Sequence, residues 1–336
     1  MKTLAIGQSL YQITVQTEGA ITEGASIEVA DAVESGGGSA PVVAYLLGKY
    51  KQDSYIGSVV GDDTYGQGLK KSLEAAGVHT EYMETAYEKR TTLEFIMLNK
   101  TNKQKTVFDI SKEPLLLKKS EFQVEPDLIY VDGYDYGSAV SSLNKYQGAK
   151  KIINAERLSK ETYELAKYCD YILATREFAE WVTGIKIDFN NQGSLVQIYS
   201  ALSGKLVKKT IIITLGGKGA LYMKDNQIKV MPGLRLEVTD TTGAGDIFKG
   251  AFCYALLQNY DLEQCVTFAN IAGGLSVQKM GAFESVPEIS DIMTYYNQKY
   301  PNAPAATAAP AGPAPAVSNP VAPSEVSPAP GSTPQA

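Results

Sequence analysis

Short runs of β-branched and aliphatic residues alternate with amphipathic stretches along most of the chain. Apolar runs typical of buried strands lie at 4–6, 54–59, 128–131, 151–153, 171–174 and 210–214. Helical periodicity occupies the intervals at 42–49, 66–76, 160–167, 178–183 and 194–203. This alternation predicts an α/β fold in which a mostly parallel central sheet is flanked by helices.

Two segments, about 10–34 and 91–110, do not fit that scheme because apolar and polar residues alternate in them with period 2. In the second segment, a polar stretch separates two strand-like runs, as in a hairpin. The two segments predict a separate small β-sheet. We expect this sheet to form a lid over the carboxyl ends of the main strands, where open α/β sheets bind their ligands.

The segment 301–336 differs in composition from the rest of the chain. It holds ten of the 15 prolines, and Glu325 is its only charged residue. A segment of this kind cannot bury enough apolar surface to offset the entropy lost on ordering. We therefore predict a disordered Pro/Ala-rich tail at 301–336 and one large α/β domain over 1–300.

Charge and cysteine content narrow the choice of partners and compartment. The net charge is -6, so the chain has no basic footprint for nucleic acid or an anionic membrane. No apolar run approaches the roughly 20 residues that span a bilayer, and the sequence turns polar at Gln8, too early for a signal peptide. The three cysteines show no CxxC spacing. We expect a cytoplasmic protein with a small-molecule partner.

The single histidine, His79, limits the available chemistry. One histidine cannot build a His-rich metal site, and this one lies in a predicted surface connection after a helix. Any catalysis then rests on carboxylates, backbone amides and a metal ion.

The glycine-rich run 240–252 is the most informative part of the sequence. A strand predicted at 235–238 leads into it, and an apolar helix predicted at 244–257 follows. Three residues without bulk lie at the positive end of this helix dipole, where their N–H groups form a ready anion site: Gly243, Ala244 and Gly245. Asp246 lies in the first turn, close enough to accept a proton from an attacking hydroxyl. Alternatively, the glycines only form a tight turn and Asp246 only offsets the dipole.

This run resembles the second signature of the PfkB, or ribokinase-like, family of carbohydrate kinases. Other segments resemble the family in the same order, namely the glycines Gly36, Gly37 and Gly38 before a helix, the segment 56–66, the loop 214–219, and the segments 269–270 and 279–282. No G-x-x-x-x-G-K-[ST] element occurs, which excludes a P-loop enzyme. The resemblance covers nearly all of 1–300 and implies a ribokinase-like kinase domain, with a lid through which two copies could pair.

The resemblance also implies where ATP binds. ATP would lie against Thr214, Gly216, Gly217, Lys218, Gly219 and Asn270. Its γ-phosphate would face the amides of Gly243, Ala244 and Gly245, Mg²⁺ would bridge the phosphates, and Asp246 would be the base. Some family members bind a monovalent cation such as K⁺ beside the anion site, and the matching residues are Asp240, Thr242, Gly281 and Ser285. Alternatively, Asp240 only caps a turn and Ser285 is a surface hydroxyl.

Several positions depart from the family pattern. The acceptor site would include Gln12, Gly37, Gly38 and Val42, but Gln12 stands where many members carry aspartate, and Val42 stands where they carry asparagine. The Asn-x-x-Glu element associated with Mg²⁺ corresponds to the altered segment 175–178. Lys249 replaces a small polar residue or histidine. It either reaches a phosphate or, as we expect, is a solvated helix position.

These features leave two classes of function open. The first is an ATP-dependent kinase for a hydroxyl of a sugar, a sugar derivative or a nucleoside. The second is a non-catalytic nucleotide-binding homologue of such kinases. The intact run from Gly243 to Asp246 favours the enzyme, whereas Gln12 and Val42 favour the alternative.

Overall fold

A ten-stranded sheet forms the centre of the computed structural model, which describes residues 1–19, 22–29, 31–110 and 114–299. Its strands are β1 (Lys2–Ile6), β4 (Asp53–Gly61), β5 (Val78–His79), β6 (Met83–Ala86), β9 (Leu128–Val131), β10 (Lys150–Ala155), β11 (Tyr171–Thr175), β12 (Thr210–Thr214), β13 (Ala220–Lys224) and β14 (Gln227–Met231). Their order is β14-β13-β12-β11-β10-β9-β1-β4-β5, and β6 pairs with β4. Only the pairs β12/β13 and β13/β14 are antiparallel. The prediction of a mostly parallel sheet is therefore confirmed.

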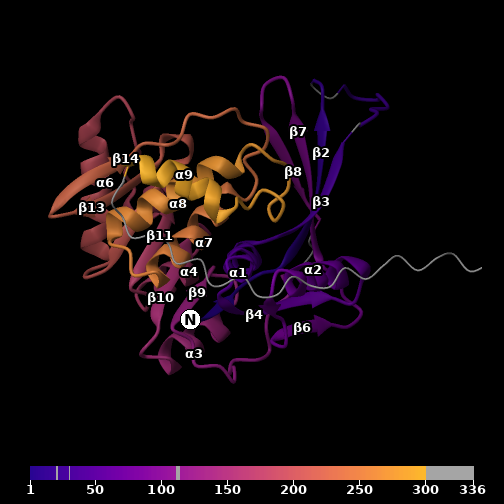
Figure 1. Cartoon of the computed structure of the whole chain (residues 1–336), viewed down its shortest axis with the longest axis horizontal. Coiled ribbons are helices and arrows are strands. Elements are labelled where there is room, and N and C mark those ends of the chain that lie inside the picture. Colours follow the sequence, from indigo (N-terminus) through magenta and orange to yellow (C-terminus); the bar gives the residue numbers. More distant parts are fainter. Residues whose placement is uncertain (20–21, 30, 111–113, 300–336) are drawn as a thin grey trace, which may run out of the picture. The chain divides into compact units, whose positions relative to one another are not determined.

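Helices cover both faces of this sheet (Figure 1). They are α1 (Ser39–Lys49), α2 (Thr64–Ala75), α3 (Tyr136–Lys145), α4 (Lys160–Ala166), α5 (Arg176–Thr183), α6 (Gln192–Lys205), α7 (Ala244–Leu257), α8 (Leu262–Ser276) and α9 (Ile289–Lys299). Strand β9 shows why both faces need cover. Leu128 and Tyr130 belong to a core cluster that includes residues of α1, α7 and α8, whereas Ile129 and Val131 belong to a second cluster that includes residues of α3, α4 and α6. Strands buried on both sides read as continuous apolar runs, which made them recognisable.

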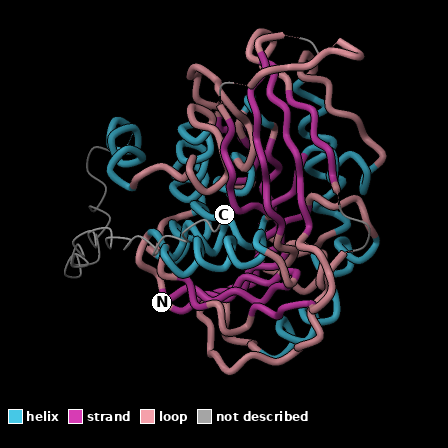
Figure 2. The backbone as a smooth tube through the Cα atoms, turned by 90° about the vertical axis from the view of Figure 1, so that its right-hand side faces the viewer, coloured by secondary structure: helices cyan, strands magenta, loops and turns pink. Residues whose placement is uncertain are grey.

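A second, four-stranded sheet forms the small sheet that the sequence predicts. It consists of β2 (Leu10–Thr17), β3 (Ala32–Gly37), β7 (Thr92–Asn99) and β8 (Lys105–Asp109), in the order β3-β2-β7-β8. The pair β2/β7 is parallel and the other two pairs are antiparallel. In Figure 2 the strands of this small sheet run upright, and the nearest strands of the large sheet lie across them.

Two element predictions need correction. Within the first segment of the small sheet, predicted at about 10–34, strand β3 begins only at Ala32 and extends through Gly37, past the predicted end. The predicted strand 235–238 is not a strand. Its period-2 pattern finds no strand partner, because the chain leaves the sheet edge after β14 and docks on the end of α8, where the amides of Thr239 and Asp240 donate to the Val277 carbonyl. The tail predicted at 301–336 lies outside the described residues.

None of the helices in the described ranges is long and apolar enough to cross a membrane. All three cysteines are buried and unpaired. His79 lies on β5, stacks on Tyr55 and contacts Asp53 at 2.8 Å. It is therefore an edge-strand residue and does not line the cavity described below.

Candidate active site

A cavity of about 360 Å³ lies where the carboxyl ends of the central strands meet the small sheet and α7. The small sheet contributes Gln12, Glu94 and Lys105; the strand ends contribute Asp132, Asn154, Glu156, Thr175 and Thr214; and the start of α7 contributes Gly243, Gly245 and Asp246. The cavity therefore lies at the edge of the sheet that the α/β topology predicts.

The start of α7 is built for close approach by a ligand. Gly243 has φ of 74°, and a Cβ there would lie 2.8 Å from the Ala282 methyl carbon, so only glycine fits. The first amides of a helix have no intrahelical acceptor and lie at the positive end of its dipole. Of the predicted anion site, Gly243 and Gly245 line the cavity next to Asp246, and Ala244 lies between them in the chain.

The Asp246 carboxylate belongs to a closed ring of polar contacts. Ser39 Oγ donates to Asp246 Oδ1 at 2.6 Å, and Asn154 Nδ2 donates to Ser39 Oγ at 2.9 Å and to Glu156 Oε2 at 3.2 Å. Lys249 Nζ closes the ring, at 2.8 Å from Glu156 Oε2 and 3.3 Å from Asp246 Oδ1. Both contacts to Asp246 therefore engage Oδ1, and no contact among the described residues is seen at Oδ2.

Hydrogen-bond direction within this ring is settled by counting protons. The one hydroxyl proton of Ser39 goes to Asp246, so Ser39 Oγ accepts from Asn154 and also from the Tyr130 hydroxyl at 2.6 Å. Tyr130 is fully buried, and burial raises its pKa well above the ordinary value. The Tyr130 hydroxyl therefore stays protonated, donates to Ser39 Oγ and fixes the position of the Ser39 side chain.

Lys249 is not the solvated helix residue that the sequence predicts. Its side chain is 1% exposed and faces two carboxylates, Glu156 and Asp246. Burial alone would lower the pKa of Lys249, but the two carboxylates outweigh burial and raise its pKa. The same ammonium holds the pKa of the Glu156 carboxyl well below its usual range. The helix face that carries Lys249 points into the cavity rather than into solvent, which periodicity alone cannot show.

The predicted acceptor residues are only partly brought together. Gln12 and Gly38 line the cavity, and Gly37 lies against the Gln12 amide, where a Cβ would approach the amide carbon to 2.6 Å. Val42, by contrast, is 0% exposed within the apolar core and does not line the cavity. Ser39, one turn earlier on α1, takes its place at the cavity wall because it lies at the first helical position.

The predicted ATP loop follows β12 as expected. Thr214 ends the strand and lines the cavity, and Gly216–Lys218 form a short 3-10 turn. Gly219 has φ of 101°, and a Cβ there would lie 1.8 Å from the Met231 carbonyl oxygen. Gly217 has open space around it. The loop thus combines one sterically required glycine with one that leaves room for a ligand.

Asn270, which lies on α8, supports this loop indirectly. Its Nδ2 donates to the Pro232 carbonyl at 2.8 Å. The next residue, Gly233, packs so closely on the loop that a Cβ there would lie 2.4 Å from the Gly217 carbonyl oxygen. Asn270 therefore holds the segment that faces the loop and does not line the cavity itself.

The four residues of the predicted cation site do come together. Asp240 accepts the amide of Thr242 at 2.8 Å and that of Gly281 at 3.3 Å, and the Ser285 amide donates to the Gly281 carbonyl at 3.0 Å. Ser285 is 2% exposed, so it is not a surface hydroxyl, although Asp240 does cap a turn. Thr242 Oγ1 is buried without a partner among the described residues, and such an oxygen fits a bound cation.

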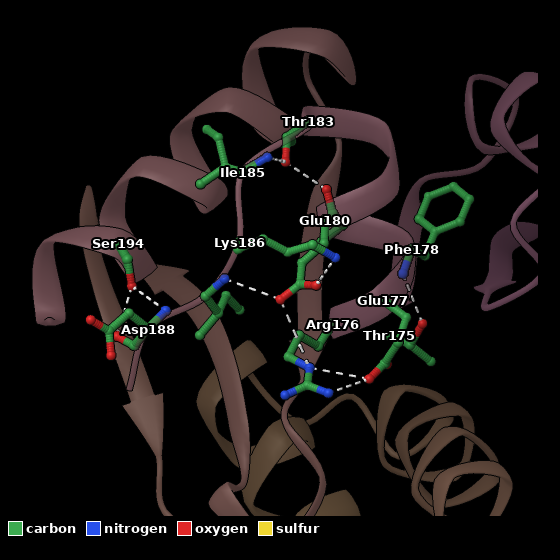
Figure 3. A network of polar contacts seen from close by, with 12 residues as sticks. Thr175, Arg176, Glu177, Phe178, Glu180, Thr183, Ile185, Lys186, Asp188 and Ser194 are labelled. Carbon is green, nitrogen blue, oxygen red and sulfur yellow. Dashed lines mark hydrogen bonds and ion pairs between the residues drawn. The ribbon is translucent and has the colours of Figure 1, made fainter. Parts of the chain in front are cut away.

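The altered segment 175–178 lies at the start of α5. Thr175 caps the helix by accepting the Phe178 amide at 3.2 Å, and it also lines the cavity. Arg176 turns away to pair with Glu177 at 2.7 Å and Glu180 at 4.0 Å, as Figure 3 shows. The one carboxylate of this segment, Glu177, is thus engaged by the neighbouring Arg176.

Asp132 was missed by the sequence analysis although it follows directly after β9. It is 2% exposed and accepts the amides of Gln8 at 2.9 Å and Tyr134 at 3.1 Å. Burial raises the pKa of Asp132 to about 8, although these two amides oppose the shift. Asn154, near the end of β10, and Glu156, directly after it, were missed in the same way. Position at the carboxyl end of a parallel strand was the available signal for all three.

The fold and the cavity define a small-molecule kinase of the α/β class. The chain belongs to the pfkB family of carbohydrate kinases, whose model matches residues 2–289. It is therefore a phosphotransferase with an alcohol group as acceptor, and its fold is ribokinase-like.

Individual relatives are distant. The chain is 26% identical to the ribokinase of Haemophilus influenzae over 246 residues, which are 71% of this chain and 79% of the relative. Among solved structures, the 2-dehydro-3-deoxygluconokinase of Thermotoga maritima aligns with a TM-score of 0.76 at 19% identity, over 88% of this chain and 99% of that one. The Arabidopsis thaliana ribokinase complexed with ribose and ATP gives 0.72 at 20% identity, over 88% and 98%.

Proposed function

We propose that this protein transfers the γ-phosphate of ATP to a hydroxyl of a sugar or sugar derivative, with Asp246 as the base. The observation that carries the proposal is the placement of Asp246 beside the amides at the start of α7, inside the cavity. Its Oδ1 is held by Ser39 and Lys249, which leaves Oδ2 to take the proton of the attacking hydroxyl. The amides would stabilise charge on the transferred phosphoryl group.

The nucleotide would bind along the loop that follows β12. Gly217 leaves room for a phosphate, and Thr214, just before this loop, lines the cavity. The Arabidopsis relative was solved with ATP, which supports the same nucleotide here. Closure of the small sheet over the cavity would exclude water, which otherwise competes as acceptor.

Mg²⁺ and K⁺ belong to the same proposal. The described residues hold no group of three or more acidic, histidine or cysteine side chains that could bind a metal. Mg²⁺ would therefore be held mainly by the ATP phosphates, whose charge it offsets. K⁺ would bind where Asp240, Thr242, Gly281 and Ser285 meet, and the unpartnered Thr242 hydroxyl supports that site.

The small sheet also supports pairing of two copies. Its edge strand β8 is exposed along its whole length, with Val107 44% and Phe108 48% exposed. Exposed edge strands with apolar residues pair readily with another strand. Sedimentation of the wild type and of Phe108→Lys measures this pairing, and a wild type that stays monomeric at high concentration contradicts it.

Phosphorylation of a panel of sugars and nucleosides, followed by ADP release, tests the function. Turnover of a sugar by the wild type but not by Asp246→Asn supports the proposal. The competing function, a nucleotide-binding homologue without activity, predicts ATP binding with no turnover of any acceptor. Gln12 is the residue that favours that alternative, since Val42 lies in the core.

A further inference from the structure

The orientation of the Gln12 side-chain amide is fixed by Glu94. Gln12 Nε2 donates to Glu94 Oε2 at 2.8 Å, across the neighbouring strands β2 and β7, where the two residues are directly paired. Gln12 is 7% exposed, and its Oε1 has no partner among the described residues. Both side chains line the cavity. Gly37 makes this packing possible, because a Cβ there would lie 2.8 Å from Gln12 Oε1.

Both side chains line the cavity, and one N–H of the Gln12 amide is used by Glu94, so the unpartnered Gln12 Oε1 is left to accept a hydrogen bond. Leaving a buried acceptor oxygen without a donor costs more free energy than leaving an exposed one without a donor, unless a ligand supplies the donor. The Glu94 carboxylate lines the same cavity as Asp246. Burial raises the pKa of Glu94, the hydrogen bond from Gln12 opposes that shift, and the charges of Asp109 and Asp246 add to it, while Lys105 opposes it. A ligand that donates hydrogen bonds therefore satisfies the acceptor oxygens of this wall.

Resting on the proposed kinase function, we infer that Glu94 and Gln12 act as one unit that selects the acceptor. Glu94 supplies, one strand away, the negative charge that Gln12 lacks, and Gln12 Oε1 accepts a second hydrogen bond. The unit binds two donor groups on the acceptor, such as neighbouring hydroxyls of a polyhydroxylated sugar. The glutamine is thus compensated by Glu94 and is not a sign of lost acceptor binding.

A charge exchange between the two positions tests this inference. Glu94→Gln should raise the KM for the acceptor on the order of 10- to 100-fold, because a hydrogen bond to a charged group is lost. Gln12→Glu places two carboxylates side by side and should weaken acceptor binding to a similar extent. The double variant, Gln12→Glu with Glu94→Gln, restores one carboxylate and one amide in contact. It should return the KM to within about fivefold of the wild type.

The assay uses D-ribose, D-glucose and D-fructose as probe acceptors, and binding of each to the ATP-free protein is measured by calorimetry. Glu34→Gln is the matched control, since Glu34 lies on the adjacent strand β3, contacts the Tyr11 hydroxyl and does not line the cavity. The KM for ATP and the affinity for ATP should stay unchanged in every variant. These readouts separate an acceptor effect from a folding defect.

The outcomes separate this inference from the proposed function. Weakened acceptor binding in both single variants with recovery in the double variant supports the paired unit. A wild type that phosphorylates a probe while Glu94→Gln keeps the same acceptor KM overturns the inference and leaves the kinase function standing. If both single variants bind the acceptor weakly and the double variant binds it more weakly than either, the pairing is also overturned. If the wild type binds ATP but neither binds nor phosphorylates any of the three sugars, the inference and the proposed kinase function are both overturned.

Discussion

The ammonium of Lys249 lies between two carboxylates, 2.8 Å from Glu156 and 3.3 Å from Asp246. The side chain is 1% exposed, so the cation is retained inside the protein only because these partners compensate for lost hydration. The contact fixes one oxygen of Asp246 and gives the anion site a built-in positive charge. The residue that most departs from the family pattern in α7 therefore lies next to the proposed base.

Lys249→Met should lower kcat on the order of 100-fold while changing the KM for the acceptor only a few-fold. The reason is that Asp246 loses one of the two contacts that orient it, whereas the cavity wall is otherwise retained. The free energy of unfolding should fall by about 1–3 kcal/mol, less than for a fully buried pair, because Glu156 and Asp246 are partly exposed. Lys150→Met is the matched control, since Lys150 donates to the Leu256 carbonyl away from the cavity. Equal kcat in Lys249→Met and wild type would contradict the positioning role.

Asp246→Asn should remove a proton acceptor without removing the ligand site. Loss of a general base typically lowers the rate by about 10²- to 10⁴-fold. The affinity for ATP should stay within a few-fold of the wild type, because the amides at the start of α7 remain. Steady-state turnover and equilibrium binding of ATP measure the two quantities separately. Turnover that survives the substitution would rule out Asp246 as the base.

Much of the fold could be predicted because its signals are local. Strands 128–131 and 210–214 and the helix 244–257 match the structure at both ends, since each is a dense apolar run bounded by polar or glycine residues. The segment 235–238 shows the limit of such patterns. Exposed and half-buried residues do alternate in it, as in a surface strand, but the chain just after it, at Thr239 and Asp240, bonds to the end of α8 and not to a strand.

The site was less predictable because it joins distant residues. The glycines and Asp246 are consecutive, so a local motif revealed them. Ser39 and Asn154 lie 115 residues apart, and only the folded chain brings Asn154 to the serine that donates to Asp246. Lys249 looks like a surface lysine in the sequence because its partner Glu156 is 93 residues away.

The buried carboxyl of Asp132 should make stability depend on pH. Its pKa is about 8 in the folded chain against an ordinary value of 3.8, so between these values the folded state binds a proton that the unfolded state releases. The contribution is present at low pH and is lost as pH rises toward 8, with a slope of at most about 1.4 kcal/mol per pH unit. Asp132→Asn should flatten this slope, whatever its absolute stability, whereas the control Asp127→Asn, at an exposed carboxylate, should not. Denaturant unfolding between pH 5 and about pH 8 measures both.

Potassium should strengthen nucleotide binding if the loop around Asp240 holds a cation. A positive charge next to the start of α7 would increase its attraction for phosphate. We expect ATP affinity to be several-fold higher in K⁺ than in a bulky organic cation at matched ionic strength. Thr242→Val should reduce this difference in affinity, because it removes the unpartnered hydroxyl. Thr241→Val changes the neighbouring residue, which is not one of the four cation-site residues, and should leave the difference unchanged. Equal affinities of the wild type in both salts would exclude the cation site.

The two glycines of the loop after β12 should respond differently to the same small change. Gly219→Ala should lower the free energy of unfolding by about 2 kcal/mol or more, because its φ is 101° and the added methyl would meet the Met231 carbonyl. The affinity for ATP should fall with it, since β13 can no longer hold the loop in place. Gly217→Ala meets no atom within 4 Å and should change stability by less than about 0.5 kcal/mol. If a phosphate lies over Gly217, this variant should nevertheless lose ATP affinity, so calorimetry on both variants separates a structural glycine from a ligand-facing one. Unchanged ATP affinity in Gly217→Ala would place the phosphates elsewhere on the loop.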